Sequence, residues 1–207
     1  LVKEKFIGTE STITLGRLRS INVFILGEAY QPGMYTVSSL STLTNAIFKS
    51  GGVRPTGSLR NIQVKRKGEL VTTLDFYDLL LNGDTSNDLR LLEGDVVFIP
   101  PITKTVGIIG EVSRPAIYEL KENESLGDLV SFSGNLKHKA ALTSIEVQRV
   151  MNDGFELIEI DLSKSENEKF DLNNGDVIKV YPVENSLKNA VLLSGHVLKP
   201  GFYAWRE

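Results

Sequence analysis

The chain contains no cysteine, and its only histidines are His138 and His196. A disulfide framework and thiolate chemistry are therefore excluded, and a zinc site is not expected from two distant histidines. No stripe of basic residues is present, which argues against nucleic acid as the main partner. No apolar run reaches the roughly 18 residues that a membrane-spanning helix needs. The first residues lack the basic start and apolar segment of a signal peptide.

What the sequence does contain is a nine-residue pattern written three times. It reads GEAYQPGMY at 27–35, GEVSRPAIY at 110–118 and GHVLKPGFY at 195–203. A pattern that recurs at such a distance indicates repeated domains. Its shared positions are Gly27, Pro32 and Tyr35 in the first copy, Gly110, Pro115 and Tyr118 in the second, and Gly195, Pro200 and Tyr203 in the third.

Each copy predicts a β-hairpin, because a short apolar run precedes the glycine and a second strand follows the proline. Pro32 followed by Gly33 is typical of a type II turn, in which the glycine adopts a positive φ. The second copy has Ala116 where Gly33 stands. We therefore expect its turn to be of type I or slightly strained.

A helix is predicted after each of the first two hairpins, over 42–50 and 125–133. Leu43, Ala46, Ile47 and Ser50 share one face of the first helix, and we expect Leu43, Ile47, Leu126 and Val130 to be buried against a sheet. Ser41 or Thr42 can cap the start of the first helix, and Gly51 can end it. Gly134 is its counterpart, and Asn135 replaces Gly52 as another residue that tolerates a left-handed backbone.

Alternating strands follow at 62–66 and 145–149, and each domain closes on a Gly-Asp turn and a last strand. These turns are Gly94-Asp95 and Gly175-Asp176. A short helix is expected at 74–83, whereas its counterpart at 160–169 is degenerate and charged. The order of elements predicts an α+β fold of two tandem β-grasp domains plus the opening hairpin of a third. The predicted boundaries are 1–20 for an upstream element, 21–103 and 104–184 for the two repeats, and 185–207 for the truncated third; we read the chain as a piece of a longer protein.

Together these motifs resemble the SLBB (soluble-ligand-binding β-grasp) domain. Tandem copies are similar to those of bacterial outer-membrane polysaccharide export proteins of the Wza type. The resemblance implies a periplasmic, outer-membrane-associated protein that forms a homo-oligomeric ring. Its implied partners are the polysaccharide in transit and an inner-membrane polysaccharide co-polymerase.

Candidate chemical sites are few, and each has a simpler structural explanation. Asp171–Asp176 resembles a calcium loop, but its glycine comes one position early and Pro182 takes the place of the last ligand. Asp84 and Asp88 are expected in a solvated loop, as is His138, and His196 at a hairpin surface. The motif tyrosines could stack on sugars, but packing in the hairpin is favoured. Arg114 and Trp205 are candidates for interface contacts only.

Two hypotheses follow. The first is a non-catalytic module of a capsule or exopolysaccharide export channel, without cofactor or metal; the alternative is a discrete receptor that binds a glycan or small ligand between repeats. No catalytic constellation supports an enzyme. The hairpin at 190–207 would expose apolar residues on its own. We therefore expect it to pack against the second repeat or against a neighbouring molecule.

Overall fold

The computed structural model describes residues 19–184 and 187–205, and the predicted element at 1–20 lies almost entirely outside them. The chain forms two compact units. The first unit contains the residues up to Val106 and the segment Tyr118–Asn123. The second unit contains Gly107–Ile117 and the chain from Glu124 onward. Among the described residues, no helix combines the length and the apolar character needed to cross a membrane.

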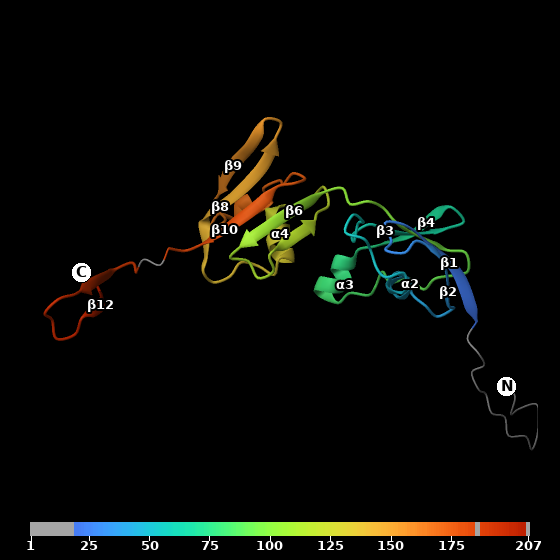
Figure 1. Ribbon diagram of the computed structural model, residues 1–207, viewed down its shortest axis with the longest axis horizontal. Coiled ribbons are helices and arrows are strands. Elements are labelled where there is room, and N and C mark those ends of the chain that lie inside the picture. The colour runs from blue at the N-terminus through green and yellow to red at the C-terminus, as the bar shows by residue number, and fades with distance from the viewer. Residues whose placement is uncertain (1–18, 185–186, 206–207) are drawn as a thin grey trace, which may run out of the picture. The chain divides into compact units, whose positions relative to one another are not determined.

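The first sheet has the strand order β2-β1-β5-β3-β4. Its strands are β1 (Ser20–Gly27), β2 (Gly33–Ser38), β3 (Ile62–Arg66), β4 (Glu69–Leu74) and β5 (Val96–Ile99). Strands β1 and β5 run parallel, and the other neighbours are antiparallel. Two short helices, α2 (Leu43–Lys49) and α3 (Phe76–Asn82), belong to the same unit (Figure 1).

The second sheet repeats this order as β7-β6-β10-β8-β9. Its strands are β6 (Thr105–Gly110), β7 (Ala116–Glu119), β8 (Ala140–Met151), β9 (Gly154–Ile160) and β10 (Val177–Pro182). Helix α4 (Leu126–Phe132) corresponds to α2, whereas the 3-10 helix η1 (Ser165–Lys169) stands where the first unit has α3. The predicted identity of connectivity in the two repeats is confirmed, and both are mixed sheets with few helices. A separate two-stranded sheet pairs β11 (Ala190–Leu193) with β12 (Gly201–Ala204).

The core of the first unit lies between its sheet and α2. Val23, Ile25 and Val97 from the central strands are fully buried, and the predicted helix face of Leu43, Ala46, Ile47 and Ser50 is buried with them. Fully removing apolar side chains of this size from water contributes about 1.5–3 kcal/mol each. This burial, rather than the propensity of a seven-residue helix, holds α2 in place.

The predicted buried face of α4 is half wrong. Leu126 is fully buried as expected, but Leu129 is the second buried residue and Val130 is only partly covered. Leu129 occupies the position of Ala46, so the larger side chain takes the place in the core. Val130 instead lines a cleft beside α4, which is described below.

The predicted turn and cap geometries also differ. Gly33 does not adopt a positive φ and begins β2, so Ala116 fits the second copy without strain. Thr42 makes no side-chain cap; instead, the Thr44 N–H donates to the Asp88 carboxylate at 2.8 Å. Asp88 is therefore a helix-capping residue and not only a member of a solvated loop. Asn135 does adopt the expected left-handed backbone, with φ 67°.

Candidate functional site

The motif glycine is required where strand β1 meets strand β5. A Cβ atom on Gly27 would lie 2.1 Å from the carbonyl oxygen of Ile99, and one on Gly110 would lie 2.0 Å from that of Val180. Just beyond each glycine, the next N–H donates to the same carbonyl, from Glu28 to Ile99 at 2.9 Å in the first unit. Gly195 has the same left-handed φ, at 96°, but no atom lies within 4 Å of its ideal Cβ position.

Each motif aspartate is buried and forms an ion pair with a partly exposed arginine, in both units. Asp95 is fully buried and receives two hydrogen bonds from the Arg66 guanidinium, at 2.7 and 2.8 Å. Asp176 pairs in the same way with Arg149. Each carboxylate also accepts a backbone N–H in its turn, from Leu92 in the first unit. The hydrogen bond to Asp95 raises the pKa of Arg66, and the two charge-assisted hydrogen bonds hold the Gly-Asp turn against β3.

The motif tyrosines pack within their hairpins. The Tyr35 hydroxyl donates to the carbonyl of Gln31, and the Tyr203 hydroxyl donates to that of Lys199, which closes the turn around the proline. Tyr118 is buried and meets the Tyr77 ring edge-on, with ring centroids 6.3 Å apart. These contacts favour a packing role over a platform for sugars.

The remaining sequence candidates are not brought together. His138 and His196 are exposed, and no group of three His, Asp or Glu residues within 19–184 and 187–205 could hold a metal ion. Asp84 accepts hydrogen bonds from Ser86, which lower its pKa. The Arg114 guanidinium donates to the Phe132 carbonyl at the end of α4, so this residue has an intramolecular role, and its interface role remains a prediction. Trp205 is 63% exposed.

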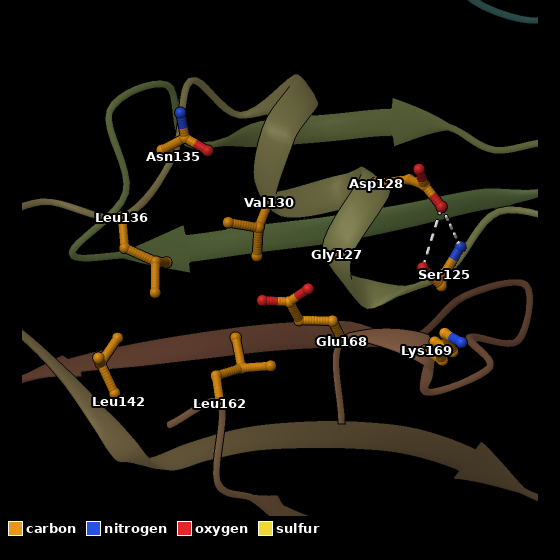
Figure 2. A pocket seen from close by; sticks show the side chains of 10 residues that line it. All are labelled: Ser125, Gly127, Asp128, Val130, Asn135, Leu136, Leu142, Leu162, Glu168 and Lys169. Carbon is orange, nitrogen blue, oxygen red and sulfur yellow. Dashed lines mark hydrogen bonds between the residues drawn. The ribbon is translucent and has the colours of Figure 1, made fainter. Parts of the chain in front are cut away.

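The second unit contains a cleft of about 550 Å3 beside α4. Figure 2 shows Val130, Leu136, Leu142 and Leu162 lining its apolar part, with the Glu168 side chain between them. Ser125, Asp128, Asn135 and Lys169 supply the polar rim. The Asp128 carboxylate accepts both the N–H and the hydroxyl of Ser125 at 2.9 Å, which fixes the start of α4. The cleft could accept a small, partly apolar group.

The cleft lies where the first unit has the Phe76 side chain, which the second unit replaces with Leu162. The Phe76 N–H donates to the Leu59 carbonyl, and the Leu162 N–H donates to that of Leu142, so the two pairs are structurally equivalent. Phe76 is buried at the start of α3 and lies 6.2 Å from the Phe48 ring, centroid to centroid. Leu162 and Ser131 occupy these positions in the second unit. The smaller side chains and the loss of α3 leave the space unfilled.

A buried charged cluster in the first unit was missed by the sequence reasoning. Arg60 is 5% exposed and donates three hydrogen bonds to Asp75, while Lys121 approaches the same carboxylate at 2.7 Å. The Glu119 carboxylate accepts the Ser58 hydroxyl and the Leu59 N–H, and its backbone carbonyl accepts from Arg60. Burial alone would raise the pKa of Asp75, but hydrogen bonds from Arg60, Lys121 and the Tyr77 N–H outweigh it and lower that pKa.

This cluster explains why Tyr118–Asn123 belongs to the first unit. The Glu119 N–H also donates to the Tyr77 hydroxyl at 2.9 Å, and Arg60 lies 4.5 Å above the Tyr77 ring. The only sequence signal was Asp75, a typical N-cap residue, before the helix that begins at Phe76. Nothing local predicted that an arginine fifteen positions earlier would share its carboxylate.

Comparison with known proteins identifies both repeats. Models of the SLBB domain match residues 22–99 and 105–156, which together make up more than half of the sequence. Two curated sequences, both described as polysialic acid transport protein KpsD of Escherichia coli, are 30% identical over 111 residues. The match covers 53% of this chain and 20% of each relative, so the chain spans a small part of their length. This chain belongs to the SLBB domain family and carries SLBB repeats similar to those of a polysaccharide export protein.

Proposed function

We propose that this chain is a non-catalytic module of a capsule or exopolysaccharide export channel and forms part of a ring-shaped translocon. The observation that carries the proposal is the pair of SLBB domains together with the similarity to polysialic acid transport protein KpsD. The same similarity supports a periplasmic location in association with the outer membrane. The proposed partners are further copies of the chain, the polysaccharide in transit and an inner-membrane polysaccharide co-polymerase.

The surface of the β8–β9 hairpin suits contact with a second copy. Val150 and Phe155 face each other across the hairpin, and Leu157 follows on the same face of β9. These three side chains are 60%, 71% and 64% exposed. Strand β9 is an edge strand, with backbone groups available for pairing. An apolar group of this kind on an open edge is typical of an interaction surface.

The proposal is tested in the bacterium that encodes the protein. Removing residues 21–183 in frame should abolish polysaccharide at the cell surface while the polymer accumulates inside the cell. Normal surface polysaccharide in that strain would contradict the proposal.

Phe155→Asp should reproduce the export defect and weaken self-association of the full-length protein. Leu80→Asp is the matched control, because Leu80 is also an exposed apolar residue, at 61%, but lies on α3. An equal effect of both substitutions would exclude β8–β9 as the specific contact.

The cleft beside α4 favours a second candidate, a receptor module for a glycan or other small ligand. Its volume of about 550 Å3 lies within the range of small-molecule sites. Calorimetric titration of the chain with oligosaccharides tests this function, with Val130→Trp as the variant that fills the cleft. Binding that survives this substitution would place the ligand elsewhere.

A further inference from the structure

The second unit has an open groove at the position where the first unit holds its charged cluster. In the first unit, a cavity of about 350 Å3 is lined by Ser58, Arg60, Asn61 and Pro101 and by the segment Glu119–Glu122. In the second unit, a larger cavity of about 840 Å3 is lined by Ala141, Thr143, Ser144 and Pro182, the residues at the corresponding positions. Leu187 and Lys188, in the connection to the third hairpin, also line it, whereas among the described residues Ala204 and Trp205, the counterparts of Glu119 and Leu120, do not.

Matching hydrogen bonds establish this correspondence. The Ile102 N–H donates to the Thr56 carbonyl in the first unit, and the Val183 N–H donates to the Lys139 carbonyl in the second. The Leu59–Phe76 and Leu142–Leu162 pairs described above agree with the same alignment. Both grooves therefore lie at the same place on their sheets, next to the start of β3 in the first unit and of β8 in the second.

The residues that would fill the second groove are present in the third hairpin. Counting from the motif tyrosines Tyr118 and Tyr203, Ala204 corresponds to Glu119. Strand β12, which contains Ala204, is largely exposed along its length. In the first unit the corresponding strand β7 is buried at its end, with Tyr118 only 8% and Glu119 only 7% exposed.

Two side chains that bond to each other in the first unit are both replaced at the corresponding positions of the later repeats. Glu119 bonds to the Ser58 hydroxyl, and both positions become alanine in the later repeat, as Ala204 and Ala141. Losing only one of these partners would leave a buried polar group unsatisfied. Asp161 follows β9 as Asp75 follows β4, and the sequence places Arg206, outside the described residues, where Lys121 stands. The two positions therefore carry the same signs of charge in both repeats.

We propose that the segment Gly201–Trp205 of this chain docks into the groove lined by Ala141, Thr143, Ser144 and Pro182, as Tyr118–Asn123 docks in the first unit. The Ala204 backbone then lies beside the Thr143 hydroxyl, where the Glu119 carbonyl meets Arg60. The longer connection from Val180 to Gly195, compared with that from Ile99 to Gly110, leaves enough chain to reach the groove. This docking does not depend on the proposed function, because it follows from the internal repeat alone.

Because the chain has no cysteine, paired cysteines can test the docking directly. Ala141→Cys with Ala204→Cys is treated with a short bis-maleimide cross-linker at low protein concentration. Asn61→Cys with Glu122→Cys is the positive control, since both residues line the cavity of the first unit and are exposed. Asp153→Cys with Ala204→Cys is the negative control, because Asp153 lies at the exposed tip between β8 and β9.

We expect cross-linked monomer from the Ala141–Ala204 pair at about ten times the yield of the negative control, because docking raises the effective concentration of the two thiols. Asp161→Lys, added to the same pair, should lower that yield. A yield at the level of the negative control would overturn the proposal. Cross-linked dimer in place of monomer would also overturn it, because the segment would then dock on a second copy.

Discussion

Gly27 and Gly33 stand six positions apart in one hairpin, and replacing each by alanine should have very different effects on stability. Gly27→Ala places a Cβ atom 2.1 Å from the Ile99 oxygen, in a residue whose φ is 81°. Gly33→Ala meets no atom within 4 Å and needs no left-handed backbone. The two variants have the same chemistry and lie in the same unit, so only the local geometry differs.

The left-handed backbone costs an alanine about 1–2 kcal/mol, and shifting the β5 backbone to relieve the overlap costs about 1–3 kcal/mol more. We therefore expect Gly27→Ala to lower the free energy of unfolding of the first unit by about 2–5 kcal/mol. Gly33→Ala should leave it unchanged or raise it by about 0.4–1 kcal/mol, since alanine restricts the unfolded chain. Ala116, at the corresponding position of the second repeat, is consistent with this tolerance.

Native-state amide hydrogen exchange followed by NMR measures the first unit separately, which a global unfolding curve of a two-unit chain does not. Amides of β1 and β5 should exchange about 30-fold faster or more in Gly27→Ala, since each 1.4 kcal/mol is a factor of ten. Amides of β8 and β10 serve as the internal control. Equal exchange of β1 and β5 amides in the two variants would refute the steric argument.

Three further predictions concern packing, pH and capping. Leu126→Ala should destabilise the second unit by about 2–5 kcal/mol, whereas Val130→Ala, at the cleft, should cost clearly less; equal losses in chemical denaturation would contradict the observed burial. Because the pKa of Asp75 is lowered, its pairing stabilises the first unit fully above the ordinary carboxyl pKa of about 3.9 and is lost as the pH falls through the lowered value. Asp75→Asn should therefore flatten the acid limb of a plot of first-unit stability against pH, and an unchanged limb would show that other carboxylates dominate it. Asp88→Ala should cost about 1 kcal/mol, the usual value of a helix cap, and its effect on exchange should be confined to the first turn of α2.

Much of this fold could be predicted because the sequence repeats its local signals. Apolar alternation located the strands, and Gly51 and Asn135 marked the ends of the helices, because these features depend on residues close in the chain. Because the same signals recur in the same order, they indicated two copies of one domain. The SLBB resemblance rested on the same local motifs, and the family models confirm it.

What only the tertiary structure decided are contacts between residues distant in sequence. Gly27 is needed because a carbonyl from Ile99 lies against it, and Asp88 caps a helix that begins far earlier in the chain. The Arg60–Asp75 pair and its contact with Glu119 depend on chain segments that the fold brings together. The cleft beside α4 lies where the first unit buries the Phe76 ring, and such a void leaves no periodic signal in the sequence because it is a property of packing in three dimensions.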